Sequence, residues 1–197
     1  MKKDKLKNLI HFFVSEIKDI PKVKLAKLLY YTDFEHYAEH NKSITKSEYV
    51  RLDFGPCPDN FQEIIRDMTD EGVLEVREKK YTRSCPEICR TYHVFRSIEE
   101  CDEDLFAANE MATIRKVLKK YGRLSGEKLA QKTHDEIPWK ATKPFGVIPY
   151  ELAWYAFAEH GAESEDAIFS ENEKFRESVA LIKRKHKEGK LNLTKAS

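Results

Sequence analysis

Apolar residues recur every three or four positions along much of this chain, a spacing that places them on one face of an α-helix. The first such series stops before Pro21, and the second starts there and reaches about His40. A proline in the first turn of a helix loses no hydrogen bond, so Pro21 is expected to begin the second helix. The same spacing predicts four more helices, at residues 58–71, 103–121, 126–134 and 149–160.

Strand-like composition replaces the helical spacing in "VLEVRE" (73–78) and "ICRTYHVFR" (88–96), which are rich in β-branched and aromatic residues. The polar segment between them predicts a hairpin with a long loop. "YVRLDF" (49–54) is expected to be a short extended piece, and residues 164–190 predict a long final helix. We therefore expect a mainly α fold. About six helices and a small antiparallel β-hairpin would form a compact domain at residues 1–162, followed by a helical extension with a basic tail at residues 163–197.

The segment "FGPCPDNF", residues 54–61, allows three interpretations. If Pro58 began a helix, Cys57 would lie at the positive end of the helix dipole, where the pKa of a thiol falls. A cysteine nucleophile also needs a base, however, and the sequence singles out no histidine for that role. A phosphate-binding loop is disfavoured, because such loops use successive backbone N–H groups and prolines have none. We interpret the segment as a rigid joint with a packed Cys57, since the residue before a proline favours extended geometry.

Charge is unevenly distributed along the 197 residues, although the formal net charge is only +1. Both ends are basic, so the middle is acidic, most visibly from Glu99 to Asp104. A dedicated nucleic-acid-binding protein presents a concentrated basic face instead, so nucleic acid is disfavoured as a partner. No apolar run approaches the roughly 20 residues that cross a bilayer, which predicts a cytoplasmic protein with no membrane contact and with reduced cysteines.

One group of potential metal ligands follows the pattern C-x3-C-x3-H-x7-C, formed by Cys85, Cys89, His93 and Cys101. Structural zinc sites usually have two tight pairs of ligands with a longer separation, which this spacing lacks. We favour packed cysteines in a hairpin and predict no metal here.

Four residues of the second predicted helix, Asp33, His36, Tyr37 and His40, share one side of that helix. An aspartate and two histidines could bind a divalent cation, but no further ligand is marked out. A hydrogen-bonded Asp33 beside the core and solvated histidines are the favoured interpretation. We therefore predict no cofactor, no assembled catalytic set and no enzymatic activity.

Two segments carry a recognisable order of motifs: "KLAKLLYYTDFEHYAEHNKSITKSEYVRLDFGPCPDNFQEII" (24–65) and "GRLSGEKLAQKTHDEIPWK" (122–140). The first has a Lys-Leu-Leu-Tyr helix, an aspartate and a Gly-Pro pair, at Lys27, Leu28, Leu29, Tyr30, Asp33, Gly55 and Pro56. The second has a Ser-Leu-Thr-His-Pro-Trp series, at Ser125, Leu129, Thr133, His134, Pro138 and Trp139. Over residues 22–76 and 113–158 the chain thus resembles the Panacea antitoxin domain family, which includes SocA-like and phage-associated GepA-like proteins.

The resemblance implies a bacterial or phage-encoded antitoxin that neutralises a cognate protein toxin by direct binding. In the SocA case the antitoxin is also an adaptor that delivers its toxin to a protease, so a protease or chaperone is an open second partner, as is a homodimer. Aromatic side chains commonly anchor interfaces, and we expect the partner-binding surface around Tyr31, Asp33, Tyr37, Phe54 and Trp139. The family motif residues expected to hold the fold are Lys27, Leu29, Tyr30, Gly55, Pro56 and His134.

Two other function classes stay open. One is a nucleic-acid-binding regulator, in which a helix and the hairpin form a winged-helix-like unit and the basic tails hold phosphates; its binding would weaken steeply with salt. The other is an enzyme that uses Cys57 or the face formed by Asp33, His36 and His40.

Overall fold

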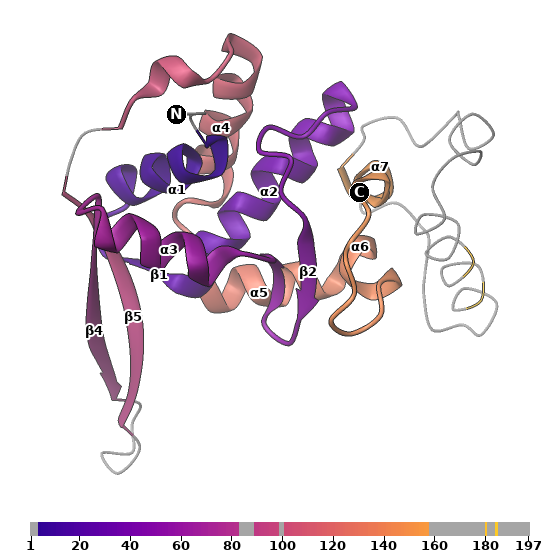
Figure 1. Cartoon of the computed structure of the whole chain (residues 1–197). Helices are drawn as coiled ribbons and strands as arrows, with labels where there is room; N and C mark the ends of the chain where they lie inside the picture. Colours follow the sequence, from indigo (N-terminus) through magenta and orange to yellow (C-terminus); the bar gives the residue numbers. More distant parts are fainter. Residues whose placement is uncertain (1–3, 83–88, 99–100, 158–179, 181–183, 185–197) are drawn as a thin grey trace.

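The computed structural model describes residues 4–82, 89–98, 101–157, 180 and 184. The described part is mostly helical and contains two small antiparallel sheets (Figure 1). This confirms the mainly α composition and the small antiparallel sheet of the predicted fold. The predicted long C-terminal helix, and with it the proposed boundary at residues 162 and 163, lies outside the described residues.

Seven α-helices and five strands make up this part of the chain. The helices are α1 (Lys5–Glu16), α2 (Lys22–His40), α3 (Phe61–Asp70), α4 (Ala108–Tyr121), α5 (Gly126–Asp135), α6 (Ile137–Ala141) and α7 (Ala153–Phe157). Single 3-10 turns, η1 (Glu103–Leu105) and η2 (Tyr150–Leu152), precede α4 and α7. The strands are β1 (Ile20–Pro21), β2 (Tyr49–Leu52), β3 (Gly55–Pro58), β4 (Leu74–Thr82) and β5 (Cys89–Ser97).

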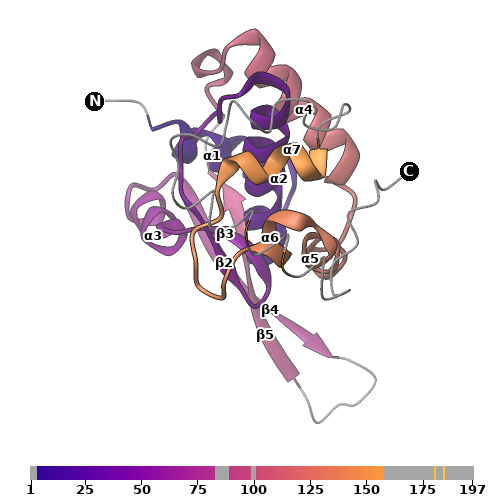
Figure 2. The same ribbon diagram turned by 90° about the vertical axis from the view of Figure 1, so that its right-hand side faces the viewer.

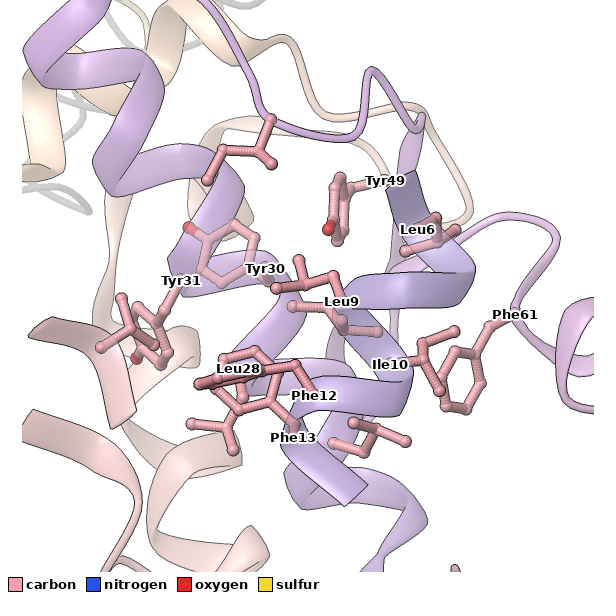
Figure 3. Close-up of a cluster of buried hydrophobic side chains, with 14 of the residues drawn as sticks. Leu6, Leu9, Ile10, Phe12, Phe13, Leu28, Tyr30, Tyr31, Tyr49 and Phe61 are labelled. Carbon is pink, nitrogen blue, oxygen red and sulfur yellow. The ribbon is translucent and has the colours of Figure 1, made fainter. Parts of the chain in front are cut away.

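Helix α2 is the centre of the domain, because α1, α4, α5, α7 and β3 all contact it. Figure 3 shows side chains of α1, among them Leu9 and Phe13, facing Leu28 and Tyr30 of α2. Every residue of α2 from Lys24 to His36 is buried, polar residues included. A helix surrounded in this way has no solvent face, so side chains on all its sides are enclosed.

Two of the prolines predicted to start helices, Pro21 and Pro58, lie in strands instead. Pro21 precedes α2 and pairs with Val94 of β5. Pro58 pairs with Tyr49 of β2, and α3 begins only at Phe61. A proline is compatible with the edge of a sheet because it lacks only one ladder donor. The prediction that Pro58 starts a helix is therefore wrong, and the segment 54–58 completes a tight hairpin.

The predicted long hairpin is confirmed as β4 and β5, which pair from Leu74↔Ser97 to Thr82↔Cys89. Strand β4 is longer than predicted, because residues 79–82 continue it rather than belonging to the loop. Strand β1 pairs with β5, giving the sheet order β1-β5-β4. Both views show the hairpin extending beyond the helices (Figures 1 and 2).

Candidate functional site

Exposed apolar side chains gather at the β2–β3 turn and the nearby chain before Val147. Phe54 in the turn is 71% exposed, Phe145 is 72% exposed and Leu52 is 36% exposed. Figures 1 and 2 show the β2–β3 turn and the chain between α6 and α7 at the same end of the domain. We call Leu52, Phe54 and Phe145, with the neighbouring Arg51 and Trp139, the tip surface. Exposed apolar residues that cluster mark interaction sites, whereas isolated ones do not.

The turn depends on Gly55, whose φ is +92°. A Cβ at this position would lie 2.7 Å from Lys27 Cε and closer still to Thr133 Oγ1. Only glycine allows this backbone geometry and this approach to α2 and α5 without strain. The glycine of the family motif therefore fixes where Phe54 stands.

Lys27 ties the same hairpin to α2. Its side chain is 2% exposed, and Nζ donates a hydrogen bond of 2.6 Å to the carbonyl of Pro56. Burial lowers the pKa of Lys27 to about 8. The buried ammonium is aimed at the strand, so Lys27 joins α2 to β3.

Phe145 is held in an unusual backbone conformation, with φ +60°. A bulky residue seldom adopts this region, which costs about 1–3 kcal/mol. Two hydrogen bonds to β2 hold it there: Phe145 N donates to Arg51 O at 2.9 Å, and Arg51 N donates to Gly146 O at 3.0 Å. The fold therefore holds Phe145 in a strained backbone conformation, although its ring is mostly exposed to solvent.

Trp139 joins the two family segments. The Arg51 guanidinium lies 3.8 Å from the Trp139 ring centroid, and the His134 ring centroid lies 4.3 Å from it. Trp139 Nε1 donates to Leu52 O at 3.1 Å, and Arg51 also donates to the carbonyl of Thr142. The half-buried indole is thus fixed between β2 and α5, with a cation beside it.

His134 is enclosed between this cluster and Lys27. Burial, followed by the charge of Lys27, lowers the pKa of His134, and its Nε2 is buried with no hydrogen-bond partner. A neutral ring fits this position, because protonation would place a second cation close to Lys27. The structure thus places His134 as a packing residue under Trp139.

Tyr31 and Asp33 were predicted on the partner-binding surface, but both are 0% exposed. Tyr31 stacks on Tyr121 with ring centroids 4.1 Å apart. Asp33 accepts hydrogen bonds from Ile44 N at 2.8 Å, Thr45 N at 2.9 Å, Tyr49 Oη at 2.8 Å and the Thr45 hydroxyl. Placing them at the surface was wrong, because α2 is covered on all sides. Asp33 instead fastens the chain after α2 to that helix.

Trp139 is hydrogen-bonded to Leu52 of the same hairpin whose turn carries Phe54, whereas Tyr37 does not join them. Tyr37 is half-buried and stacks on Tyr150 at 5.3 Å. It lies ten residues after Lys27 on α2, about 15 Å along the helix axis. Only two of the five predicted surface residues therefore belong to the tip surface.

A buried carboxylate lies at the α5–α6 junction, three residues before Trp139. Glu136 accepts hydrogen bonds from the Tyr31 hydroxyl at 2.9 Å and the Tyr30 hydroxyl at 3.3 Å. Burial raises the pKa of Glu136 to about 7, although the tyrosine hydrogen bond and Lys132, at 3.8 Å, act in the opposite direction. Glu136 thus ties the start of α6 to α2.

The alternative in which Cys57 is a reactive nucleophile assumed that a helix begins at Pro58, but α3 begins at Phe61. Cys57 lies in β3 and not at a helix N-terminus, and burial raises the pKa of its thiol. A raised pKa keeps the thiol protonated and poorly nucleophilic at neutral pH.

Neither group of potential metal ligands was predicted to hold a metal, and the histidines of α2 were predicted to be solvated, which is wrong for His36. His36 is buried, with Nδ1 2.9 Å from Thr113 Oγ1, and burial lowers its pKa to about 4. No group of three or more His, Cys, Asp or Glu residues able to hold a metal ion occurs in the described part of the chain. Cys85 and the side chain of Cys89 lie outside that part, so the prediction for the cysteine group stays a prediction.

Sequence reasoning missed Arg51, Leu52 and Phe145. Arg51 and Leu52 stand in a segment predicted only as extended, and a two-residue turn without Asn-Gly or Asp-Gly gave no hairpin signal. Phe145 lies between a proline and a glycine, which indicates a turn but not which side chain it exposes.

Comparison with known proteins identifies the family of this chain. No helix among the described residues is long and apolar enough to cross a membrane. Curated proteins and solved structures gave no significant match. The family model described as "Antitoxin SocA-like, Panacea domain" matches residues 25–140, a span that contains Lys27, Gly55, His134 and Trp139. Since that match covers more than half of the 197 residues, the chain belongs to the SocA-like antitoxin family of Panacea domains.

Proposed function

We propose that this protein neutralises a cognate protein toxin by direct binding, and that the toxin contacts the tip surface. Membership of an antitoxin family supports the toxin–antitoxin role. The observation that carries the proposed location is the gathering of Leu52, Phe54 and Phe145 beside the Arg51–Trp139 stack. Binding through such a surface needs no catalytic group and no cofactor.

The tip surface has the composition of a binding centre. Tryptophan and arginine are enriched among the residues that carry most of the binding energy of protein interfaces. Here both are already fixed, Trp139 by its hydrogen bond to Leu52 O and Arg51 by its bond to Thr142 O. Side chains ordered before association lose less entropy on binding, about 0.5–1.5 kcal/mol for each flexible side chain.

Strain at Phe145 supports the same location. Glycine or asparagine would adopt the φ of +60° with less strain and would not expose an apolar ring to water. The ring at this position is therefore explained better by a partner than by the stability of the domain. Strained backbone positions occur where a structure serves binding or catalysis.

Growth rescue tests the proposal. The product of the neighbouring gene is expressed alone, with this protein, with Phe54→Ser, or with the control Ile98→Ser, which alters a residue 61% exposed outside the tip surface. We expect toxicity alone, rescue and co-purification with the wild type and the control, and poor rescue with Phe54→Ser. Two results would contradict the proposal. One is a neighbouring product that is harmless when expressed alone, and the other is that this protein neither restores growth nor co-purifies with that product.

Delivery of the toxin to a protease is a further part of the proposal, which the SocA resemblance raises. It predicts that the toxin disappears faster in cells that contain this protein than in cells that lack it. Toxin half-life after translation is stopped measures this directly. An unchanged half-life with growth still rescued would leave neutralisation by binding alone.

A further inference from the structure

Arg51 is a cation of the tip surface that is partly removed from water. Its guanidinium lies 3.8 Å from the Trp139 ring centroid and donates a hydrogen bond to the carbonyl of Thr142. Burial lowers the pKa of Arg51, while the charge of Asp53 acts in the opposite direction. None of the ion pairs formed among the described residues includes Arg51. A guanidinium has more N–H donors than this one bond uses, so it can bind a further acceptor.

A second cation, Lys27, lies behind the same hairpin. It is 2% exposed, and its Nζ donates to a backbone carbonyl of β3 at 2.6 Å. Burial is the main cause of the lowered pKa of His134, and the charge of Lys27 is the next. Arg51 lowers this pKa too, whereas a hydrogen bond to the backbone of Asp53 and the charge of Asp135 raise it. Because Lys27 alone has a larger effect than Asp135, the charges around His134 produce a positive potential.

The charged residues beside Arg51 do not reverse this sign. The β2–β3 hairpin and the chain from 139 to 147 carry three basic residues and one acidic residue, namely Arg51, Lys140, Lys143 and Asp53. Asp135, exposed at the end of α5, adds a second carboxylate. Glu136 is buried and accepts a hydrogen bond from a tyrosine of α2, so it does not face the surface. An approaching carboxylate is therefore attracted to this end of the domain.

Backbone hydrogen bonds place Arg51 beside the exposed apolar side chains. Phe145 N donates to Arg51 O at 2.9 Å, and Leu52 follows Arg51 in β2. A partner that covers the 72% exposed ring of Phe145 also removes water from the neighbouring guanidinium. Burying a charge without a compensating acceptor is costly, so the covering surface must bring one. A carboxylate suits the planar donor fork of arginine, because two parallel N–H···O bonds can form.

We propose that the toxin presents an aspartate or glutamate carboxylate to Arg51, within a segment whose apolar side chains cover Phe54 and Phe145. This inference rests on the proposed toxin binding at the tip surface and adds the chemistry of the partner. The carboxylate takes the donors that Thr142 leaves open, and the apolar side chains exclude water from the pair. Trp139 holds the guanidinium in place before the toxin arrives.

Calorimetric titration of the neighbouring gene's product tests the inference with two matched variants. Arg51→Met keeps an apolar stem beside Trp139 and removes the charge, whereas Arg66→Met removes the same charge from an exposed position on α3, outside the tip surface. At ~50 mM salt we expect Arg51→Met to bind the toxin at least ~10-fold more weakly than Arg66→Met does. Arg51→Lys should lie between them, because lysine keeps the charge but lacks the planar fork.

A carboxylate scan of the toxin separates a direct contact from a structural role of Arg51. Each exposed aspartate or glutamate of the toxin is replaced by its amide and titrated with the wild type and with Arg51→Met. We expect one amide variant to bind the wild type at least ~10-fold more weakly and to bind Arg51→Met with less than ~2-fold further loss. Circular dichroism melts of every variant exclude a lost fold as the cause.

Three results would overturn the inference. They are equal affinities of Arg51→Met and Arg66→Met for the toxin, a scan in which no toxin carboxylate is coupled to Arg51, and a dimer of this protein alone that Phe54→Ser/Phe145→Asn dissociates. The third result would assign the surface to a second copy of this chain. If the first or second occurs while Phe54→Ser/Phe145→Asn still weakens toxin binding, the proposed function stands and only the partner's chemistry is wrong.

Discussion

Replacing Glu136 by glutamine is expected to stabilise this protein at high pH and not at low pH. The Glu136 carboxyl is buried, and its pKa is about 7, compared with an ordinary value of 4.5. The folded protein therefore holds a proton on Glu136 up to about pH 7, whereas the unfolded chain releases it near pH 4.5. The state that holds more protons is disfavoured as pH rises, so stability decreases across this window.

The size of the effect follows from the shift. Each pKa unit corresponds to 1.36 kcal/mol, so a shift of this size makes the folded state about 3 kcal/mol less stable above pH 7 than it is with a neutral Glu136. Glutamine is neutral at every pH and keeps an oxygen that accepts from the Tyr31 hydroxyl. It loses the contact with Lys132, whose own side chain is 48% exposed, and a pair of this kind contributes about 0.5 kcal/mol. We expect Glu136→Gln to be about 1–3 kcal/mol more stable than the wild type at pH 8, and close to it at pH 4.5.

Urea unfolding of both proteins at pH 4.5 and pH 8 measures this difference. His36, with a pKa lowered to about 4, makes stability rise with pH between about 4 and 6.5, but it does so in both proteins and cancels in the comparison. Glu63→Gln, on the exposed face of α3, is the control and should lower the free energy of unfolding by less than about 1 kcal/mol at both pH values, because it removes only a helix-dipole interaction. The reasoning is refuted if Glu136→Gln differs from the wild type by the same amount at both pH values.

Three further predictions concern the residues that hold the tip surface and α2. Gly55→Ala should lower the free energy of unfolding by about 2–4 kcal/mol in urea, because its Cβ meets Thr133 and its φ is positive; an unchanged midpoint would contradict this. Asp33→Ala should lower the free energy of unfolding by about 3 kcal/mol in the same assay, since it leaves buried N–H groups and the Tyr49 hydroxyl without their acceptor. A decrease of less than about 1 kcal/mol would contradict this. Cys57 should react with iodoacetamide at neutral pH far more slowly in the folded protein than in urea, as peptide mapping would show, because burial raises its pKa; equal rates would restore the reactive-cysteine alternative.

Helices were predictable where one face is apolar and the other is solvated. The apolar face of α3, from Phe61 to Met68, is buried as the spacing predicts, whereas α1 is buried at every position from Leu9 to Val14, His11 included. Helix α2 was placed correctly as an element, but its exposed residues were not predictable from spacing. Tyr31 and Asp33 are enclosed by segments distant in sequence, namely Tyr121 and the chain at Thr45.

Tertiary contacts decided what the local sequence left open at the tip surface. Pro58 is compatible with both a helix start and an edge strand, and pairing with Tyr49 selected the strand. The motif glycine and tryptophan indicated a family, but not that Gly55 packs on α5 or that Trp139 lies beside Arg51. The final predicted helix lies outside the described residues, and its prediction stands unchanged.

Calorimetric titration of the toxin with two double variants tests the central claim most directly. Phe54→Ser/Phe145→Asn removes the two most exposed rings of the tip surface, and asparagine tolerates the left-handed backbone at position 145. Val76→Ser/Ile98→Ser removes exposed apolar groups outside the tip surface. We predict an affinity at least ~30-fold below wild type for the tip variant, about 2 kcal/mol, and wild-type affinity for the control. Equal affinities for the two variants, both still folded, would contradict the tip surface as the toxin-binding site.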